Sequence, residues 1–516
     1  MACLGSLTGA EVRQFFNLTA QEVKVDSLLP MFSHSMNLGA GYADSVYTVS
    51  IEYPEFYDMS EADVERCRQL TDLSSLPELP VVEQYVGVSR KSGTLYLRMV
   101  PIVKRQGKYQ KLVSFMLRVR SQALSSSSLR RAPQSGAVYA SHSVLSSGRW
   151  AKIRVSQTGV HELSSSLIKK AGFTDLSKVK VYGYGGAMQP EKLTPEYLTA
   201  TDDLTEVPLC TVGGRRLFYA TGPVSWSNST SLTRTRNPYS NYGYYFLTES
   251  DTEPAVLDSA AFLASFYPSP DDYHSLAETD DFSWYHGGRN LFESSALETG
   301  VNRSYTLDAT SAKGQLTVLI SYDGAGQVLV FLNGHQVGTA SITNTSFIGQ
   351  YVKAASSSWT FPVDSLLTGE NEVILRKTSG DGTLRLDYLS LCCESPAAAP
   401  SLAGGKFPEP VFDSQVTNQD LHGDAPTDMV IIIPASRKLL TQAQRIQQLH
   451  QEKDGLRVRI VAADELYNEF SSGTPDANAY RRYLKMLYDR AETESDMPRY
   501  LLLMGQPLAA KFTLSK

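Results

Sequence analysis

Apolar and polar positions near the C-terminal end follow two periods in turn, those of a buried strand and of an amphipathic helix. Residues 429–433 are a purely apolar run closed by Pro434, which is typical of a strand buried on both faces of a parallel sheet. A helical spacing follows and ends at Gly455. Its apolar positions are Leu439, Ala443, Ile446 and Leu449.

The same alternation then repeats. Residues 456–461 predict a second strand, and Thr474-Pro475-Asp476 predicts a helix start, with an N-cap hydroxyl, a first-turn proline and an early acid. Residues 500–504 predict a third strand that ends at Gly505. The buried face of the second helix is expected to carry Tyr480, Leu484, Leu487 and Ala491. The pattern predicts the first half of an open α/β sheet, with its site at the carboxyl ends of the strands.

The rest of the chain shows short alternating runs, which indicate antiparallel β structure. Within residues 22–120 these runs are 46–53, 81–88, 94–103 and 111–119. A second group begins at Trp150, includes a short helix that ends at Gly172, and contains an aromatic cluster over residues 239–246. We expect that cluster to pack one β layer on another rather than to bind a ligand.

Residues 272–393 carry strands at nearly regular spacing, with Asn333-Gly334 as a hairpin turn. This spacing predicts a β-sandwich or jelly roll. The segments 331–334, 370–373 and 386–389 resemble carbohydrate-binding jelly rolls. A structural spacer with the same fold is an equally good interpretation, because a fold does not determine a function.

These patterns predict a multidomain, mainly β protein followed by an incomplete α/β segment. Pro, Ala, Gly and Ser-rich stretches mark the boundaries between domains. The predicted division is a β domain over 1–120, a linker over 121–136, a second β-rich domain with a short helix over 137–271, the sandwich over 272–393, a linker over 394–427 that should be cut early by proteases, and the α/β segment over 428–516.

Composition and charge narrow the classes of function that this chain can have. The chain has 516 residues and a net charge of −6, so no basic face points to nucleic acid. No run approaches the roughly 20 apolar residues of a membrane helix, so no transmembrane segment is predicted. Residues 1–10 lack the charged and apolar regions of a signal peptide.

Cysteine and glycine patterns offer no cofactor or metal site. The five cysteines form no CxxC pair and no metal-like cluster with histidine, and the adjacent pair is best interpreted as the packed end of a strand. The glycine-rich residues 182–186 predict a tight turn rather than a phosphate cradle, and His286 is expected to be a packed or surface histidine. The cysteines are Cys3, Cys67, Cys210, Cys392 and Cys393.

One polar stretch carries a resemblance to a known family. Residues 467–476, followed by the helical pattern 479–490, resemble the N-terminal part of gingipain-type cysteine peptidase domains, and in particular the surface sortases of the type IX secretion system. The resemblance extends from about Leu29 to Gly505, and residues 468–489 are its most specific part. Other matching segments are Trp150-Ala151-Lys152-Ile153 with Gly159-Val160, residues 237–240, residues 244–247 and residues 500–505.

The resemblance implies a caspase-like α/β domain with a His/Cys dyad. It implies an endopeptidase and transpeptidase that removes C-terminal signals from exported cargo and joins the new end to a surface glycolipid. It also implies secreted cargo with C-terminal signals and other secretion-system components as partners, and a location in the cell envelope, at the outer-membrane surface. It implies no cofactor.

The chain departs from this family at its end. The family has an aspartate after the glycine that ends the third strand, where this chain has Gln506, and residues 507–516 do not resemble the family. No cysteine follows Cys393, and the only histidines after the sandwich are His422, in the predicted linker, and His450, in the first helix. A Cys/His mechanism needs both groups within hydrogen-bond reach, so we assign no catalytic residue.

Two interpretations therefore stay open. In the first, the chain is the N-terminal portion of a gingipain-type peptidase, truncated before its catalytic residues and inactive by itself. In the second, it is a non-enzymatic cell-surface binding protein that uses the carbohydrate-binding-like jelly roll.

Overall fold

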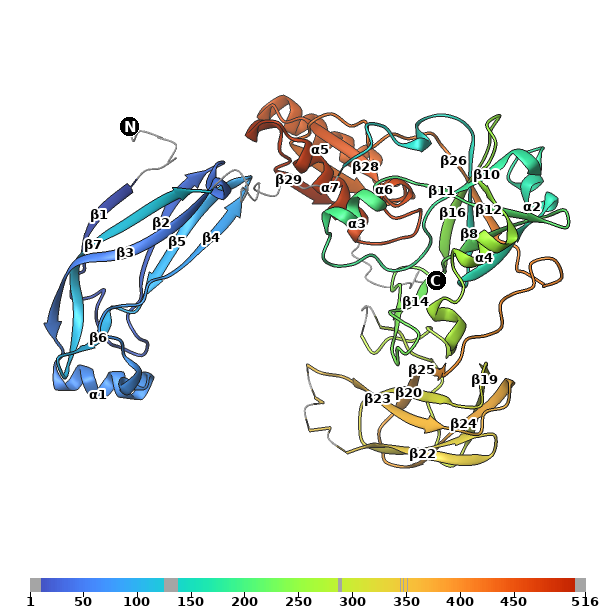
Figure 1. Cartoon of the computed structure of the whole chain (residues 1–516), viewed down its shortest axis with the longest axis horizontal. Helices are drawn as coiled ribbons and strands as arrows, with labels where there is room; N and C mark the ends of the chain where they lie inside the picture. The colour runs from blue at the N-terminus through green and yellow to red at the C-terminus, as the bar shows by residue number, and fades with distance from the viewer. Residues whose placement is uncertain are drawn as a thin grey trace. The chain divides into compact units, whose positions relative to one another are not determined.

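The computed structural model describes residues 11–124, 138–285, 290–343, 345–346, 348–349 and 351–505 (Figure 1). The chain divides into two compact units, Met1–Gly136 and Ala137–Lys516. Antiparallel sheets dominate both, as the sequence predicted, and a small parallel sheet lies near the C-terminal end. No helix within these described ranges is long and apolar enough to cross a membrane.

The N-terminal unit is a sandwich of two antiparallel sheets. Inward-facing Leu95 and Leu97 from one sheet pack against Phe115 and Leu117 from the other. One sheet has the order β1-β7-β3, with β6 on β7, and the other has the order β2-β5-β4. The strands are β1 (Glu11–Asn17), β2 (Phe32–Gly39), β3 (Ser45–Asp58), β4 (Glu83–Ser89), β5 (Ser92–Met99), β6 (Ile102–Arg105) and β7 (Lys108–Ala123).

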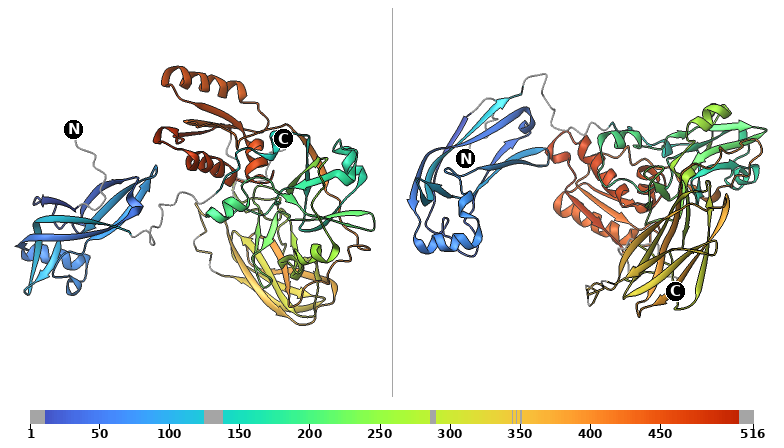
Figure 2. Two further views of the ribbon diagram at one scale, coloured as in Figure 1. Left: turned by 45° about the horizontal axis from the view of Figure 1, so that its top comes forward. Right: turned by 60° about the horizontal axis from the view of Figure 1, so that its bottom comes forward.

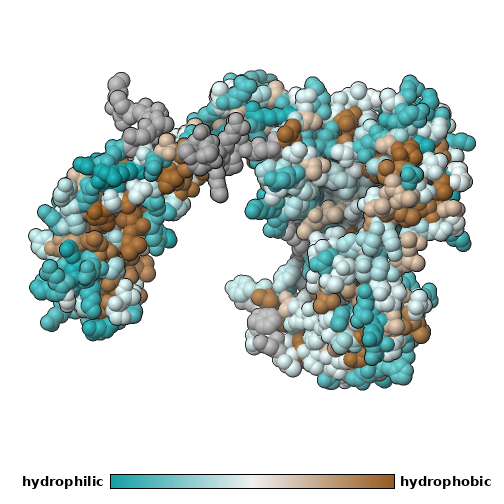
Figure 3. Space-filling view, in the orientation of Figure 1, coloured by the Kyte–Doolittle hydropathy of each residue, from teal (hydrophilic) through white to brown (hydrophobic). Residues whose placement is uncertain are grey.

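Three elements here were absent from the sequence prediction, namely β1, β2 and helix α1 (Glu61–Leu70). The Ser60 side chain caps α1 by accepting a hydrogen bond from the Asp63 N–H. Strand β7 runs to Ala123, so the first residues of the predicted linker 121–136 belong to a sheet. The unit also exposes apolar surface (Figure 3), which includes Val86 and Val88 along β4.

The second unit begins with two further sheets that pack around one core. The orders are β11-β10-β16-β8-β26 and β17-β12-β13-β9. The strands are β8 (Trp150–Val155), β9 (Gly159–Leu163), β10 (Val179–Tyr182), β11 (Glu206–Val207), β12 (Leu209–Val212), β13 (Arg215–Ala220), β16 (Gly243–Glu249), β17 (Val256–Leu257) and β26 (Val411–Val416). Three short helices accompany them, α2 (Ser165–Lys170), α3 (Pro195–Ala200) and α4 (Ser259–Ala264). Tyr245 of the predicted aromatic cluster lies in this core, where it packs on Phe218.

The segment 394–427 differs from the predicted linker. Strand β26 pairs antiparallel with β8 at the edge of that sheet, with an irregularity between Phe412 and Ser414. Upstream, the Arg215 guanidinium donates to the carbonyl oxygens of Leu402 (3.2 Å) and Gly405 (2.7 Å). The Pro and Ala content suggested a free linker, whereas contacts with distant residues fix the segment to the β core.

The predicted jelly-roll region forms two four-stranded antiparallel sheets face to face. Their orders are β18-β25-β20-β23 and β19-β24-β21-β22, around a core that includes Val318, Val330 and Leu375. Asn333 and Gly334 both have positive φ in the predicted hairpin turn. The strands are β18 (His274–Glu278), β19 (Asn302–Ala309), β20 (Gly314–Tyr322), β21 (Gly326–Leu332), β22 (His335–Ile342), β23 (Ala355–Val363), β24 (Gly369–Ser379) and β25 (Leu384–Cys393).

A short ribbon of β14 (Val224–Trp226) and β15 (Arg234–Arg236) contributes its arginines to the sandwich. Arg234 forms ion pairs with Glu278 and Asp387, which are almost fully buried. The predicted boundaries of the sandwich domain, at residues 271 and 393, remain predictions.

The α/β part has three parallel strands in the order β28-β27-β29, namely β27 (Met429–Ile433), β28 (Val458–Ala462) and β29 (Tyr500–Leu503). Helix α5 (Leu440–Asp454) covers one face, and α6 (Ala463–Phe470) and α7 (Asn478–Arg490) cover the other (Figure 2). The three strands and the helix that ends before Gly455 match the prediction.

The second predicted helix differs. It begins at Asn478, not at Thr474, and an additional helix, α6, occupies the first half of the predicted polar loop. Thr474 does not cap α7 as predicted, because its hydroxyl lies 3.3 Å from the Gly185 carbonyl of the preceding β core. The predicted acid, Asp476, joins the two parts: its carboxylate accepts from the Gln189 N–H and from the N–H of Asn478, the first residue of α7.

Candidate functional site

The strand order of the parallel sheet locates a topological switch point. The chain passes from β27 to β28 on one side and then to β29 on the other, so the connections diverge between the carboxyl ends of β27 and β29. Ligands of open α/β sheets bind in the crevice at such a point. Pro434 and Gly505 stand there in contact: a Cβ added at Gly505 would lie 3.2 Å from the Pro434 ring.

A charged cluster fixes the loop that follows β27. The Arg437 guanidinium donates to Asp464 (3.0 Å) and Glu465 (3.1 Å) in the first turn of α6. Arg437 has a positive φ of 56°, which is uncommon for a residue with a side chain. The ion pairs therefore hold this turn at the carboxyl edge of the sheet.

The two histidines of the α/β part lie elsewhere. His450 belongs to the last turn of α5, just before the amino end of β28, and its Nδ1 pairs with Asp454 at 2.6 Å. His422 is fully buried. Neither imidazole is available at the switch point.

His422 lies in a buried carboxylate cluster instead of a linker. Its Nδ1 is 2.6 Å from Glu469 Oε2, its Nε2 is 3.4 Å from Asp202 Oδ1, and its ring stacks on Phe470. Burial opposes the imidazolium charge, but the carboxylates of Asp202 and Glu469 outweigh it and raise the pKa of His422 to about 9. The charged His422 thus joins the α/β part to the β core.

One cysteine and one histidine are cross-strand neighbours, yet they form no dyad. Cys392 on β25 pairs in register with His274 on β18. The Cys392 thiol donates to the Ser229 carbonyl (3.4 Å), while the two His274 ring nitrogens face the carbonyls of Pro270 and Ser231. Burial raises the pKa of the Cys392 thiol, which opposes the thiolate that a nucleophile needs.

The other described cysteines have packing roles too. Cys67, Cys210 and Cys393 are buried and free. The Thr310 N–H donates to the Cys393 sulfur at 3.4 Å inside the sandwich, which agrees with the interpretation of the adjacent pair as a strand end. Cys3 and His286 lie outside the described residues.

The stretch that carries the family resemblance is an interface within the second unit. The buried Lys152 ammonium on β8 donates to the Gly473 carbonyl (2.6 Å) and to Asn468 Oδ1 (3.2 Å), and it lies 4.3 Å from the centre of the Tyr244 ring. Burial lowers the pKa of Lys152 to about 8. Three of the resembling segments, at 150–153, 244–247 and 468–476, therefore meet at one lysine.

The glycine-rich segment serves the same interface. The N–H groups of Tyr184 (3.0 Å) and Gly185 (3.4 Å) donate to the Ser472 hydroxyl, which donates to the Tyr244 carbonyl. A Cβ at Gly183, which has a φ of 133°, would lie 2.6 Å from that hydroxyl oxygen. The turn contains glycine because a serine from the peptidase-like segment approaches so closely.

Arg482 of α7 completes the contact. Its side chain is almost fully buried, and its guanidinium donates to the carbonyls of Phe470 and Thr201, to Gln189 Oε1 and to the Tyr184 hydroxyl. The two Nη atoms bond to neutral oxygen atoms, whereas the buried Nε has no hydrogen-bond partner among the described residues. Arg482 thus anchors the helix without an ion pair to a described carboxylate.

Comparison with known proteins agrees with this geometry. Residues 422–510 match the family model of peptidase family C25. The α/β part is therefore similar to the gingipain-type peptidases. The chain is also similar to dimeric latent PorU from Porphyromonas gingivalis, with a TM-score of 0.56 and 25% identity over 71% of this chain. It spans 43% of the length of that PorU chain.

Two other solved structures match shorter parts of the chain. One is the CBM36-1 domain of a multidomain xylanase from the hindgut metagenome of Trinervitermes trinervoides (TM-score 0.18, 19% identity, 24% of this chain and 98% of that one). The other is a complex of the pro- and mature domains of RgpB from Porphyromonas gingivalis (TM-score 0.15, 11% identity, 25% of this chain and 88% of that one). No curated protein matched.

The C25 match begins at His422, the histidine that the sequence analysis placed in a linker. The interface around it was not foreseen, since Glu469, Ser472, Thr474 and Asp476 are polar residues that a local pattern assigns to a solvated loop. One signal was the pair Lys152 and Arg154, which alternate with apolar residues in β8 and so lie on one face of that strand. Such charged residues indicate polar partners elsewhere in the chain.

Proposed function

We propose that this chain is part of a gingipain-type cysteine endopeptidase that acts as a surface sortase of a type IX secretion system. The switch point at Pro434 and Gly505, within a segment that matches family C25, is the observation that carries the proposal. The similarity to PorU over 71% of this chain supports the sortase branch over other C25 peptidases. The substrates in this proposal are exported proteins with C-terminal signals.

The chemistry needs a thiolate and an imidazole at the carboxyl edge of the sheet. In our proposal both come from sequence other than residues 422–505, because His422 is buried in an ion cluster and His450 lies before the amino end of β28. Residues of this chain fix the loop that follows β27 at the carboxyl edge of the sheet. They are Arg437 and its two acidic partners. The chain alone is therefore expected to be inactive.

The β core has a supporting role in this proposal. Lys152, Ser472 and Arg482 bind the α/β part to it through buried hydrogen bonds. A peptidase at the cell surface benefits from such a rigid base, since the loops at the carboxyl edge then keep their positions. Other components of the secretion system are the partners that the proposal implies.

A cleavage assay tests the expected inactivity. Purified chain is incubated with a cargo protein that carries its C-terminal signal, with and without iodoacetamide, and PorU serves as the positive control. We expect no signal removal by the chain. Cleavage that alkylation abolishes would identify a cysteine of this chain as the nucleophile and contradict our assignment.

The genomic DNA that follows the codon for Lys516 tests the family role. A peptidase is expected to have further strands, a histidine and a cysteine encoded nearby in one of the reading frames. A non-enzymatic surface binding protein has no need of them, so a downstream region without such coding sequence would count against the peptidase proposal.

A further inference from the structure

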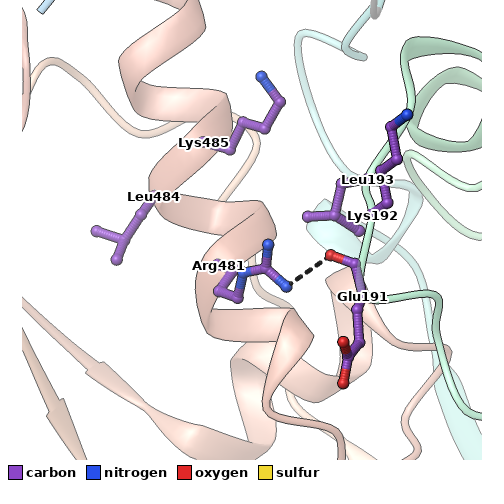
Figure 4. A pocket seen from close by; sticks show the side chains of 6 residues that line it. All are labelled: Glu191, Lys192, Leu193, Arg481, Leu484 and Lys485. Atoms are coloured by element: carbon purple, nitrogen blue, oxygen red, sulfur yellow. Dashed lines mark hydrogen bonds between the residues drawn. The ribbon is translucent and has the colours of Figure 1, made fainter. Parts of the chain in front are cut away.

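A groove lies between helix α7 and the segment that precedes α3 (Figure 4), and neither Pro434 nor Gly505 of the switch point lines it. Its volume is about 720 Å³, within the range of ligand sites. The lining side chains are those of Glu191, Lys192, Leu193, Arg481, Leu484 and Lys485.

The groove combines positive charge with apolar walls. Three of its side chains are basic and one is acidic, and the two leucines come from opposite sides, Leu193 from the loop and Leu484 from the helix. The Lys485 ammonium pairs with Asp489 at 2.8 Å. The Lys192 ammonium forms no hydrogen bond or ion pair with any described residue. Among the described residues, the positive charge of Lys192 therefore has no carboxylate partner.

Arg481 is held in place by neutral groups. Its Nη1 donates to the Glu191 carbonyl oxygen (3.0 Å) and to Asn478 Oδ1 (2.6 Å). Its Nη2 and Nε donate to no described residue. These two nitrogens form one edge of the planar guanidinium, and that edge matches the two oxygens of a carboxylate. The arginine is thus preorganised for a bidentate anion.

A second hollow continues the groove. Its volume is about 300 Å³, it shares Glu191 and Arg481 with the first, and its wall includes Gln189, Tyr239 and Asn478. Asp476 also lines the second hollow, and its carboxylate accepts from the N–H groups of Gln189 and Asn478. Together the two hollows form a path past Arg481, with the two leucines in the first and mainly polar groups in the second. Such a path fits an extended chain better than a compact small molecule.

We infer that this groove binds an extended peptide with a carboxylate next to an apolar side chain. The carboxylate pairs with the Nη2 and Nε edge of Arg481, the Lys192 ammonium adds a second contact, and the apolar side chain packs between Leu193 and Leu484. The site is independent of the proposed peptidase activity, because neither the switch point nor a catalytic dyad takes part in it.

Fluorescence anisotropy tests the inference with the full chain. The probe is a fluorescein-labelled hexapeptide of alternating leucine and glutamate, and the matched probe has glutamine for glutamate. We expect saturable binding of the acidic probe only. Arg481→Gln should weaken it about tenfold, as for hydrogen bonds to charged groups, and Lys192→Gln about threefold, as for an exposed ion pair.

The control variant is Arg445→Gln, which removes an exposed arginine of α5 that does not line the groove. It should bind like the wild type, and melting curves should confirm that all three variants are folded. If Arg445→Gln and Arg481→Gln lost the same amount of affinity for the acidic probe, the binding would be non-specific charge attraction and the inference would be wrong.

Competition separates a peptide site from a small-anion site. Succinate and inorganic phosphate at concentrations matched to the peptide should leave the anisotropy unchanged. The peptide assignment would be wrong if either anion displaced the probe as effectively as the unlabelled peptide does. It would also be wrong if the glutamine probe bound as tightly as the acidic probe.

Discussion

At the scale of single residues, buried charges decide how the second unit is held together. His422 is enclosed by Glu469, Asp202 and Phe470, and the N–H groups of Leu421 and His422 also donate to the Glu469 carboxylate. Removing one partner of a buried ion pair leaves an uncompensated charge and costs about 3–5 kcal/mol. The cluster is therefore a strong constraint on the position of α6.

We predict that this cluster makes stability fall in alkaline solution. The folded pKa of His422, about 9, is above the unfolded value of about 6.5. The stabilisation is fully present below pH 6.5 and is lost as pH rises through 9. Urea unfolding followed by tryptophan fluorescence should show a midpoint that decreases over this window.

Two substitutions test the assignment. His422→Gln should lower the free energy of unfolding at pH 6 by about 3–5 kcal/mol and remove this alkaline decrease. His335→Gln, at an exposed histidine, should change neither quantity. If the urea midpoint of His422→Gln still decreased in alkaline solution, a group other than His422 would be responsible.

A second prediction concerns Asp387 under the β14–β15 ribbon. Arg234 pairs with its Oδ1 at 2.8 Å, while the buried Oδ2 has no hydrogen-bond partner. Burial raises the pKa of Asp387 to about 7; Arg234 opposes the shift, and Glu278 and Asp280 add to it. Because the folded pKa is raised, stability decreases as pH rises from about 4 to about 7.

Asp387→Asn should therefore stabilise the protein at pH 8 by about 1–3 kcal/mol, because the neutral amide avoids the cost of burying the carboxylate charge. The amide keeps an oxygen for Arg234. Asp381→Asn, at an exposed aspartate of the same sandwich, is the control and should have no effect. Thermal melts at pH 5 and pH 8 measure the stability of both variants. A lower melting temperature of Asp387→Asn at pH 8 would show that the fold needs the charge of Asp387.

At the scale of elements, the β-sandwich has a complete core of its own. Two four-stranded sheets enclose Val318, Val330 and Leu375, and all of their strands lie within residues 274–393. We predict that the fragment 272–393 folds alone. It should give a β-type circular dichroism spectrum and a cooperative melt. Val330→Asp, which places a charge in the core, is the unfolded reference.

A helical spectrum or a gradual melt of the wild-type fragment would contradict this prediction. It would mean that the sandwich depends on the β14–β15 ribbon, whose Arg234 and Arg236 neutralise its buried acids.

The parallel sheet ends in an open strand. Among the described strands β29 pairs only with β27, and Tyr500, Leu501 and Leu503 are 54%, 44% and 57% exposed. Exposed apolar edges promote association between chains. We predict concentration-dependent self-association by analytical ultracentrifugation and weaker association in Leu503→Lys.

Leu367→Lys is the matched control, since Leu367 is an exposed leucine in the sandwich. Both substitutions should change stability by less than about 0.5 kcal/mol. Equal association of the two variants would mean that β29 is not the contact.

At the scale of the whole molecule, the segment 394–410 connects the sandwich to β26 and stays attached to the β core. Arg215 donates to carbonyls along it, Leu402 is buried, and the Pro408 carbonyl accepts from the Glu162 N–H. The sequence suggested early proteolysis here, but these contacts oppose it. We predict that trypsin cuts after Lys406 slowly in the native protein.

Arg215→Gln should increase the rate of that cut about tenfold, because it removes the charged donor that fixes the backbone. Arg216→Gln, which removes a bond to the Ser177 carbonyl instead, is the control. Mass spectrometry of the early fragments measures both. Rapid cleavage after Lys406 in the wild type would restore the original linker interpretation.

The sequence by itself determined elements whose signal is local. Residues 429–433 predict a buried strand because five consecutive apolar residues have no other low-energy position, and Gly455 ends α5 because it adopts the left-handed conformation that residues with side chains avoid. The regular strands of the sandwich and the resemblance to gingipain-type peptidases were also readable from the sequence, as the C25 match shows.

Tertiary structure alone decided the roles of the polar residues. Ser472 and Thr474 belong to no solvated loop because their partners, Gly185 and Tyr184, lie nearly 290 residues away along the chain. The same holds for His422, whose charge depends on Asp202 and Glu469. A local pattern reports how apolar a residue is, but whether a polar group is buried depends on which distant donor or acceptor satisfies it, and only the folded chain determines that.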